Sequence, residues 1–169
     1  MRSGGGKSKG ANFEREICRR LSLWLSDGTQ EDALWRSSMS GGRSTVAFKR
    51  GKRMAAQAGD ISAVHEVGIP LISKFLIECK SYKDLNFIGL LKSKGKLVEF
   101  WKEVKLQANR YGKEPMLIAK QNQQPVIIAL SVLGSGALKL SSSPIISAPY
   151  IGMQIYLFDY FLSEATPPK

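Results

Sequence analysis

The sequence has very few of the residues that build disulfide frameworks, zinc sites or catalytic triads. It contains two cysteines, Cys18 and Cys79, and one histidine, His65, among 169 residues. No C-x-x-C pair or Cys/His cluster occurs, which argues against disulfide frameworks and zinc sites. A Ser-His-Asp or Cys-His site would have to use His65, which has no partner motif, so we interpret it as a structural or surface residue.

Long apolar runs are also missing. No run approaches the roughly 18 residues that would suggest a membrane span, and the opening MRSGGGKSKG lacks the apolar stretch of a signal peptide. We therefore expect a soluble, cytoplasmic protein without a membrane partner. Residues 1–11 are too polar to pack and predict a flexible basic arm.

Acidic residues are scarce relative to basic ones. The 25 Lys plus Arg against 14 Asp plus Glu give a formal charge of +11, which calls for a polyanionic partner. Residues 39–58 hold five basic side chains and no acidic one. We expect this segment, with Arg43, Lys49, Arg50, Lys52 and Arg53, to be a basic loop that reaches toward phosphate.

Length and hydrophobic patterning predict one α/β domain over residues 12–165. Apolar residues at three- and four-residue steps predict helices at 12–26, with Asn12 as a possible N-cap, and at 96–111. The apolar stripe of the second helix, which includes Trp101, predicts core packing or a dimer face. The order of elements predicts a mixed central sheet flanked by helices, with strands at 33–38, 59–65, 71–80, 115–121, 125–133 and 153–165.

A carboxylate and a lysine close the predicted strand 71–80, whose apolar run ends in IECK. Side chains alternate along a strand, so Glu78 and Lys80 share one face. A solvated pair on an edge strand is the simpler interpretation of that spacing. A functional pair is the alternative.

Two further carboxylates are expected near this pair. Asp60 follows Gly59 at the start of a strand joined to the next by a short connection, and Glu14 lies inside the apolar arc of the first helix. Asp60 could be merely a turn residue, and Glu14 could merely favour the helix N-terminus. If these carboxylates lie close to Glu78, however, they repel one another, and a hard divalent cation relieves that repulsion. Mg²⁺ suits such a site and activates water for attack on phosphorus.

Two stretches resemble known nuclease families. The GD of residues 59–60 and the IECK of residues 77–80 resemble the PD-(D/E)xK nuclease motif, and KGANFERE, residues 9–16, is similar to the opening helix of archaeal-type Holliday-junction resolvases. The resemblance covers residues 9–130. It implies a restriction-endonuclease-like α/β fold with a mixed central sheet flanked by helices.

The resemblance also implies roles for single residues. The implied catalytic set is Glu14, Asp60, Glu78 and Lys80, and the implied metal ligands are Glu14, Asp60, Glu78 and the backbone carbonyl of Cys79. The expected ion is Mg²⁺, with Mn²⁺ as a substitute. DNA contacts are implied for Arg15, Arg36 and Ser40, in addition to the basic residues of the loop at 39–58.

The sequence departs from the family pattern at two places. Gly59 stands where the name of the motif has proline, and the interval between Glu14 and Asp60 is longer than in the compact archaeal enzymes. The extra length places an insertion in the basic loop. Phage-encoded nucleases are also similar to this chain, with a tryptophan-bearing helix after E-x-K.

The favoured interpretation is a Mg²⁺-dependent endodeoxyribonuclease, a phage or archaeal-type resolvase of Holliday junctions. We expect a homodimer, because a four-way junction has near two-fold symmetry and paired strands need two active sites. The same fold could instead serve a restriction-like or DNA-repair nuclease. A catalytically inactive DNA-binding module and an RNA-binding accessory protein are the alternatives outside this class.

Overall fold

The computed structural model describes residues 5–37 and 58–169, with side chains from residue 9 onward. Most of the predicted basic loop therefore lies outside the described residues. The same holds for the DNA contacts predicted within it, which are Ser40, Arg43, Lys49, Arg50, Lys52 and Arg53.

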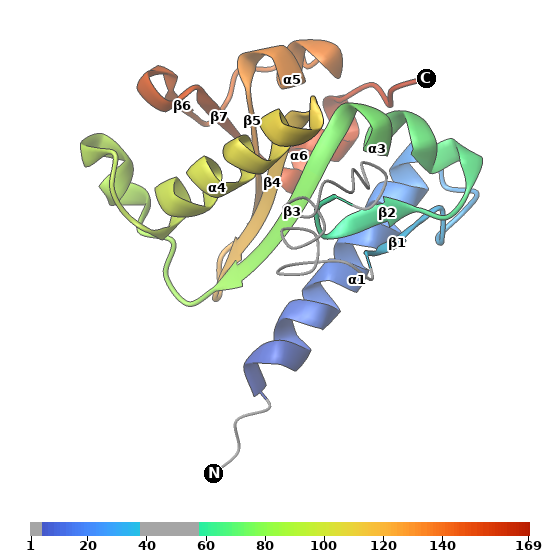
Figure 1. The fold of residues 1–169 in the computed structure, drawn as a ribbon, viewed down its shortest axis with the longest axis horizontal. Coiled ribbons are helices and arrows are strands. Elements are labelled where there is room, and N and C mark those ends of the chain that lie inside the picture. The colour runs from blue at the N-terminus through green and yellow to red at the C-terminus, as the bar shows by residue number, and fades with distance from the viewer. Residues whose placement is uncertain (1–4, 38–57) are drawn as a thin grey trace.

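The centre of the fold is a mixed five-stranded sheet, which confirms the predicted fold class (Figure 1). β3 pairs in parallel with β4, and the other neighbours are antiparallel. The longest strands, β3 and β4, are continuously buried over residues 75–77 and 115–119, as expected for a parallel pair covered on both faces. The strand order is β3 (Phe75–Tyr82), β4 (Glu114–Gln121), β5 (Val126–Leu130), β7 (Met153–Leu157) and β6 (Ile146–Ala148).

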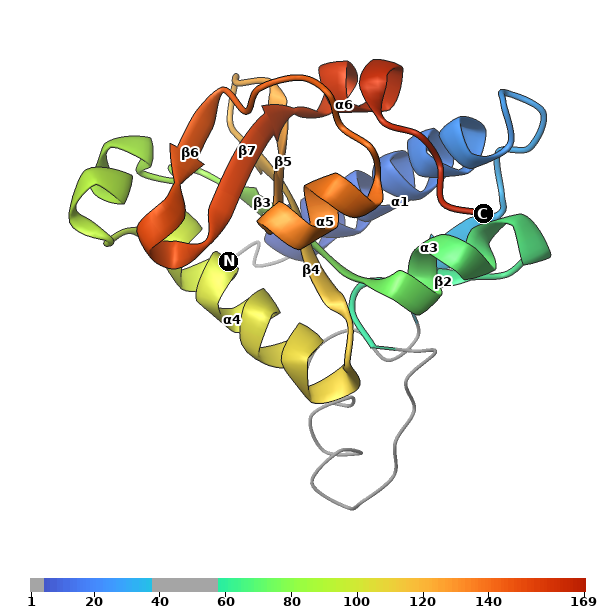
Figure 2. The ribbon, with the colours of Figure 1, turned by 90° about the horizontal axis from the view of Figure 1, so that it is seen from above.

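Helices cover both faces of this sheet (Figures 1 and 2). On one face, α1 (Gly5–Leu25) buries its apolar stripe against the odd-numbered residues of β3, and α6 (Phe158–Glu164) packs against β5 and β7. On the other face, α4 (Lys96–Tyr111) packs against Leu76 and the same side of β4. Trp101 of α4 is fully buried, so it belongs to the core and not to a dimer face.

A small second sheet lies beside the outer edge of β3. It pairs β1 (Leu34–Arg36) with β2 (Ile61–Ala63) in antiparallel register, and Arg36 stands opposite Ile61. Both strands are shorter than predicted. The chain then passes through a 3₁₀ turn, η2 (Glu66–Gly68), toward the main sheet.

The N-terminal helix begins earlier than predicted. α1 starts at Gly5, so residues 5–11 of the predicted flexible arm are helical. No proline interrupts this stretch, and a helix already nucleated by its packed part extends at little cost. Asn12 is therefore not the N-cap, and its Oδ1 accepts a hydrogen bond from an Arg15 N–H at 2.8 Å.

The predicted strand at 71–80 is a helix followed by a strand. Residues up to Lys74 form α3 (Ile69–Lys74), and β3 begins at Phe75. Pro70 lies in the first turn of α3, where its missing N–H breaks no helical hydrogen bond. A continuous apolar run does not distinguish a buried helix from a buried strand.

Two other predicted strands are also strand-helix units. The segment 153–165 divides into β7 and α6, and Phe158 and Phe161 of α6 are buried three residues apart, a helical spacing. The segment 125–133 ends as a strand at Leu130, and α5 (Val132–Ala137) follows with Ser131 as its N-cap.

The remaining elements are short. The 3₁₀ helices η3 (Phe87–Lys92) and η4 (Pro149–Ile151) precede α4 and β7. None of the helices in the described part of the chain is long and apolar enough to cross a membrane.

Candidate active site

Asp60 is fixed to the outer edge of β3. Its backbone N–H donates to the carbonyl of Ile77 at 2.8 Å, and its Oδ2 accepts from the N–H of Cys79 at 2.9 Å. These bonds satisfy groups that an edge strand would otherwise leave unpaired. The Asp60 carboxylate therefore lies directly beside Cys79, the residue between Glu78 and Lys80.

Gly59 makes this approach possible. Its φ is +89°, and a Cβ at this position would lie 2.6 Å from the carbonyl oxygen of Ile77. Proline is restricted to φ near −65°, so it cannot occupy this backbone conformation. The departure from the proline of the motif thus has a direct structural reason.

Glu78 and Lys80 share the α4 face of β3, as the alternation predicts. The Lys80 Nζ donates to Glu78 Oε1 at 2.6 Å and lies 5.6 Å from the centre of the Phe100 ring. The Lys80 side chain is 29% exposed and the Glu78 side chain 12%, so the pair is half-buried instead of fully solvated. Burial alone would lower the pKa of Lys80, but the charge and hydrogen bond of Glu78 raise it above its usual value. Lys80 is therefore a cation at neutral pH.

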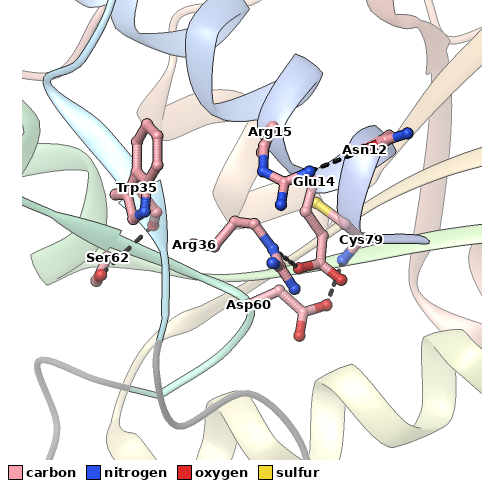
Figure 3. A network of polar contacts seen from close by, with 8 residues as sticks. All are labelled: Asn12, Glu14, Arg15, Trp35, Arg36, Asp60, Ser62 and Cys79. Carbon is pink, nitrogen blue, oxygen red and sulfur yellow. Dashed lines mark hydrogen bonds and ion pairs between the residues drawn. The ribbon is translucent and has the colours of Figure 1, made fainter. Parts of the chain in front are cut away.

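Glu14 reaches the site from α1 and meets a positive partner. The Arg36 Nε, on β1, donates to Glu14 Oε2 at 2.5 Å, and the Glu14 side chain is 15% exposed. This pairing explains how a carboxylate is tolerated within an apolar helix face. Figure 3 shows Glu14, Arg36 and Asp60 converging above β3, with Arg15 directed toward Asn12.

The Asp60 carboxylate is held in an unfavourable environment for its charge. Burial first, and the nearby Glu78 carboxylate second, raise the pKa of Asp60 to about 7; Glu14 adds to the rise. The Cys79 N–H and Lys80 act in the opposite direction. Two carboxylates thus act on a third, and a cation bound between them would relieve the repulsion.

The donor atoms suit a hard divalent cation. Asp60 Oδ1 has no hydrogen-bond partner among the described residues, and the same holds for Glu78 Oε2. In an extended strand the N–H and C=O of one residue point to the same edge, so the Cys79 carbonyl faces the edge where Asp60 lies. Two carboxylate oxygens and one carbonyl oxygen, completed by water, are a ligand set that Mg²⁺ accepts.

A larger cage of side chains is not present. Within residues 5–37 and 58–169, no three His, Cys, Asp or Glu side chains are grouped so that they could hold a metal ion together. An ion at this site would therefore depend on two carboxylates, the backbone and solvent.

The site has two features that sequence reasoning missed. Arg36, predicted as a DNA contact, is the partner of Glu14. A polar cleft of about 740 Å³ also opens between α1 and the ends of β3 and β4. The parallel register places Ser81 opposite Lys120 and so brings polar residues from the ends of both strands to this cleft. Its lining includes Lys9, Asn12, Ser81, Lys83, Lys120 and Asn122.

The two cysteine thiols and the histidine ring take no part in this arrangement. Cys18 and Cys79 are buried and unbridged, and burial with the nearby Glu14 charge raises the pKa of Cys18 to about 12. His65 is half-exposed, with its Nε2 3.7 Å from Asp32 Oδ2, in agreement with a surface role.

Comparison with known proteins gives one match. The sequence model of the family described as "Phage putative PDDEXK endonuclease" matches residues 5–162, nearly the whole chain. No curated protein and no solved structure is significantly similar to the chain.

Proposed function

The chain belongs to the family of phage PD-(D/E)xK endonucleases, and from this premise we propose that it is a Mg²⁺-dependent endodeoxyribonuclease that resolves Holliday junctions. One observation carries the catalytic part of the proposal. The Asp60 carboxylate is hydrogen-bonded to the N–H of Cys79, the residue between Glu78 and Lys80. Residues far apart in the sequence thereby share one edge of β3.

We assign the ion to Asp60, Glu78 and the Cys79 carbonyl. Bound there, Mg²⁺, or Mn²⁺ in its place, would supply a water with a lowered pKa and would neutralise charge on the phosphate. Glu14 keeps Arg36 on its Oε2, and its other oxygen would hold a water or a second ion. The pKa of Asp60 lies near 7 without a metal, so Asp60 becomes a metal ligand once the ion has displaced its proton.

Lys80 acts as a hydrogen-bond donor and not as a base, because Glu78 raises its pKa. Its ammonium orients the attacking water or a phosphate oxygen, and Glu78 fixes its position through the 2.6 Å contact. The Phe100 ring packs beside the ammonium and limits its movement.

The substrate assignment has different support. The charge of +11 fits DNA, and the KGANFERE stretch resembles junction resolvases. The cleft with Lys9, Lys83 and Lys120 offers phosphate contacts beside Arg15, which is exposed and bonded only to Asn12 among the described residues. We propose a homodimer acting on DNA in the host cytoplasm, because a junction presents two equivalent strands.

The test is cleavage of a synthetic four-way junction, a flap and a matched linear duplex, each with Mg²⁺, Mn²⁺ or chelator. We expect paired, metal-dependent nicks on the junction and none in chelator. The Glu78→Gln protein, which keeps the size of the side chain, is expected to bind the junction and not cut it.

Each contrary result has a definite meaning. Equal cutting of linear duplex would replace the resolvase assignment by a restriction-like or repair nuclease. Binding without cutting by the parent would indicate an inactive DNA-binding module, and preference for RNA over duplex DNA would refute the DNA assignment. Light scattering of the DNA-free protein tests the homodimer.

A further inference from the structure

The segment between β3 and α4 displays two large apolar side chains to solvent. Ile88 is 80% exposed and Leu91 is 85% exposed, more than any other large apolar residue in the described part of the chain. They are three residues apart in η3, and residues at that spacing lie on the same side of a 3₁₀ helix. The inward side of the same helix carries Phe87 and Leu90, which pack on the α4 core.

This segment is held firmly despite its length. At its start, the Leu85 N–H donates to Gln121 Oε1 at 2.8 Å, and the Leu85 carbonyl accepts from the Leu97 N–H at 3.1 Å. Further along, the Leu90 carbonyl accepts from the Tyr150 hydroxyl. Asn86 caps η3 by accepting from the Gly89 N–H at 3.0 Å. The exposed pair therefore stands on an anchored projection, seen in light green ahead of α4 in Figures 1 and 2.

The backbone of the projection is strained where it turns. Asn86 and Ser93, at the two ends of η3, have φ values of 53° and 52°, a conformation that side chains other than glycine seldom adopt. Strain of this kind persists only where the surrounding structure enforces it. The fold thus maintains the outward apolar pair instead of turning it inward.

The charges around the projection indicate its partner. Lys83, Lys92 and Lys94 are exposed and form no ion pair with another described residue. Asp84 is the only acidic residue between residues 83 and 95, and it accepts a hydrogen bond from the Asn86 N–H. An apolar pair flanked in the sequence by exposed lysines without ion pairs fits a polyanion with accessible apolar surface, which describes nucleic acid whose bases are unstacked.

The projection is also connected to the candidate active site. Tyr82, at the end of β3, packs edge-on against Phe100 with ring centres 5.6 Å apart, and Lys80 contacts the same ring. Glu78 and Lys80 lie on the α4 face of β3, the face from which the projection extends. The projection and the Glu78–Lys80 pair therefore lie on the same face of the sheet.

We propose that Ile88 and Leu91 form a wedge that inserts between bases at the branch point of the DNA substrate. The inference rests on the proposed DNA nuclease function and deepens it, because it gives a physical reason for choosing branched over linear DNA. Base pairs at a branch point unstack at lower cost than those within a duplex. The lysines hold the adjacent phosphates while the apolar side chains replace lost stacking.

The test uses a four-way junction with a fluorescent adenine analogue at the branch point, in Ca²⁺ instead of Mg²⁺ to limit cleavage. Fluorescence of the analogue rises when it unstacks, and anisotropy gives the affinity for the junction and for a linear duplex. The variant is Ile88→Ser with Leu91→Ser. The matched control is Val132→Ser with Leu133→Ser, since these residues of α5 are 63% and 73% exposed.

We expect the parent and the control to raise the fluorescence, and the Ile88/Leu91 variant to lose the rise. The variant should bind the junction about tenfold more weakly, with the affinity for linear duplex changed less than about twofold. Unchanged thermal unfolding of the variant would show that it folds.

Contrary outcomes separate the two proposals. A variant that keeps the fluorescence rise and the junction affinity overturns the wedge. So does a variant that changes from dimer to monomer in light scattering, because the apolar pair would then be a protein interface. A parent that binds without any fluorescence rise overturns the wedge alone, whereas a parent that binds no DNA overturns the proposed function as well.

Discussion

Replacing Asp60 by asparagine is expected to stabilise the metal-free protein at alkaline pH and to change its stability little in acid. The Asp60 side chain is 6% exposed, and burial with the Glu78 charge raises its pKa from 3.8 to about 7. Between these values the folded protein keeps a proton that the unfolded chain has lost. The contribution of Asp60 to stability is therefore present below the unfolded pKa and is lost as the pH rises through about 7.

The structure also sets the size of the effect. The difference between 3.8 and about 7 corresponds to roughly 4 kcal/mol of unfolding free energy. Asparagine cannot ionise, and its amide oxygen can still accept the hydrogen bond from the Cys79 N–H. The Asp60→Asn protein should therefore exceed the parent by a few kcal/mol at about pH 8 and by little at about pH 4.

Urea unfolding in the presence of chelator, at both pH values, measures this difference. Asp159→Asn is the matched control, because the Asp159 side chain is 83% exposed and its pair with Arg20 is at the surface. The control should alter stability by less than about 1 kcal/mol at either pH. If Asp60→Asn instead destabilises the protein equally at both pH values, Asp60 is not a buried, repelled carboxylate and the reasoning is wrong.

Three further changes test separate parts of the site. Lys80→Met keeps an apolar chain beside Phe100 but removes the hydrogen-bond donor. The rate of DNA cleavage in single-turnover kinetics should fall about 100-fold or more, with the DNA affinity measured by anisotropy nearly unchanged. Gly59→Ala should cost about 3 kcal/mol in urea unfolding, because its Cβ meets the edge of β3, whereas Gly112→Ala, with a positive φ and open space, should cost about 1 kcal/mol. Cys18 should resist alkylation at about pH 8 until the protein unfolds, because burial raises its thiol pKa to about 12; rapid labelling of the folded protein, followed by mass spectrometry, would contradict its place in the core.

The sequence was most informative where one periodicity dominated. The helix at 96–111 has the predicted bounds, because its apolar stripe is regular and Gly112 terminates it in a left-handed conformation. The shared face of Glu78 and Lys80 also followed from strand alternation alone. Local patterns of this kind depend on few residues and need no knowledge of the partner element.

Elements defined by tertiary packing were not predictable in the same way. The apolar run that contains α3 and β3 fits a buried helix or a buried strand equally well. Only its burial against α1 and the sheet decides where the helix ends and the strand begins. Similarly, nothing local to Asp60 shows that its carboxylate caps the Cys79 N–H. The pairing of Glu14 with Arg36 was not predictable either, since β1 is positioned by its pairing with β2.

The central claim is that Asp60 and Glu78 jointly bind one divalent cation. Calorimetric titration of the DNA-free protein with Mn²⁺ at about pH 8 tests it most directly, because this pH lies above the pKa of about 7 of the Asp60 carboxyl. We predict one bound ion per chain for the parent and loss of that binding in both Asp60→Asn and Glu78→Gln. Binding that is absent from the parent, or that survives unchanged in both variants, would contradict the claim.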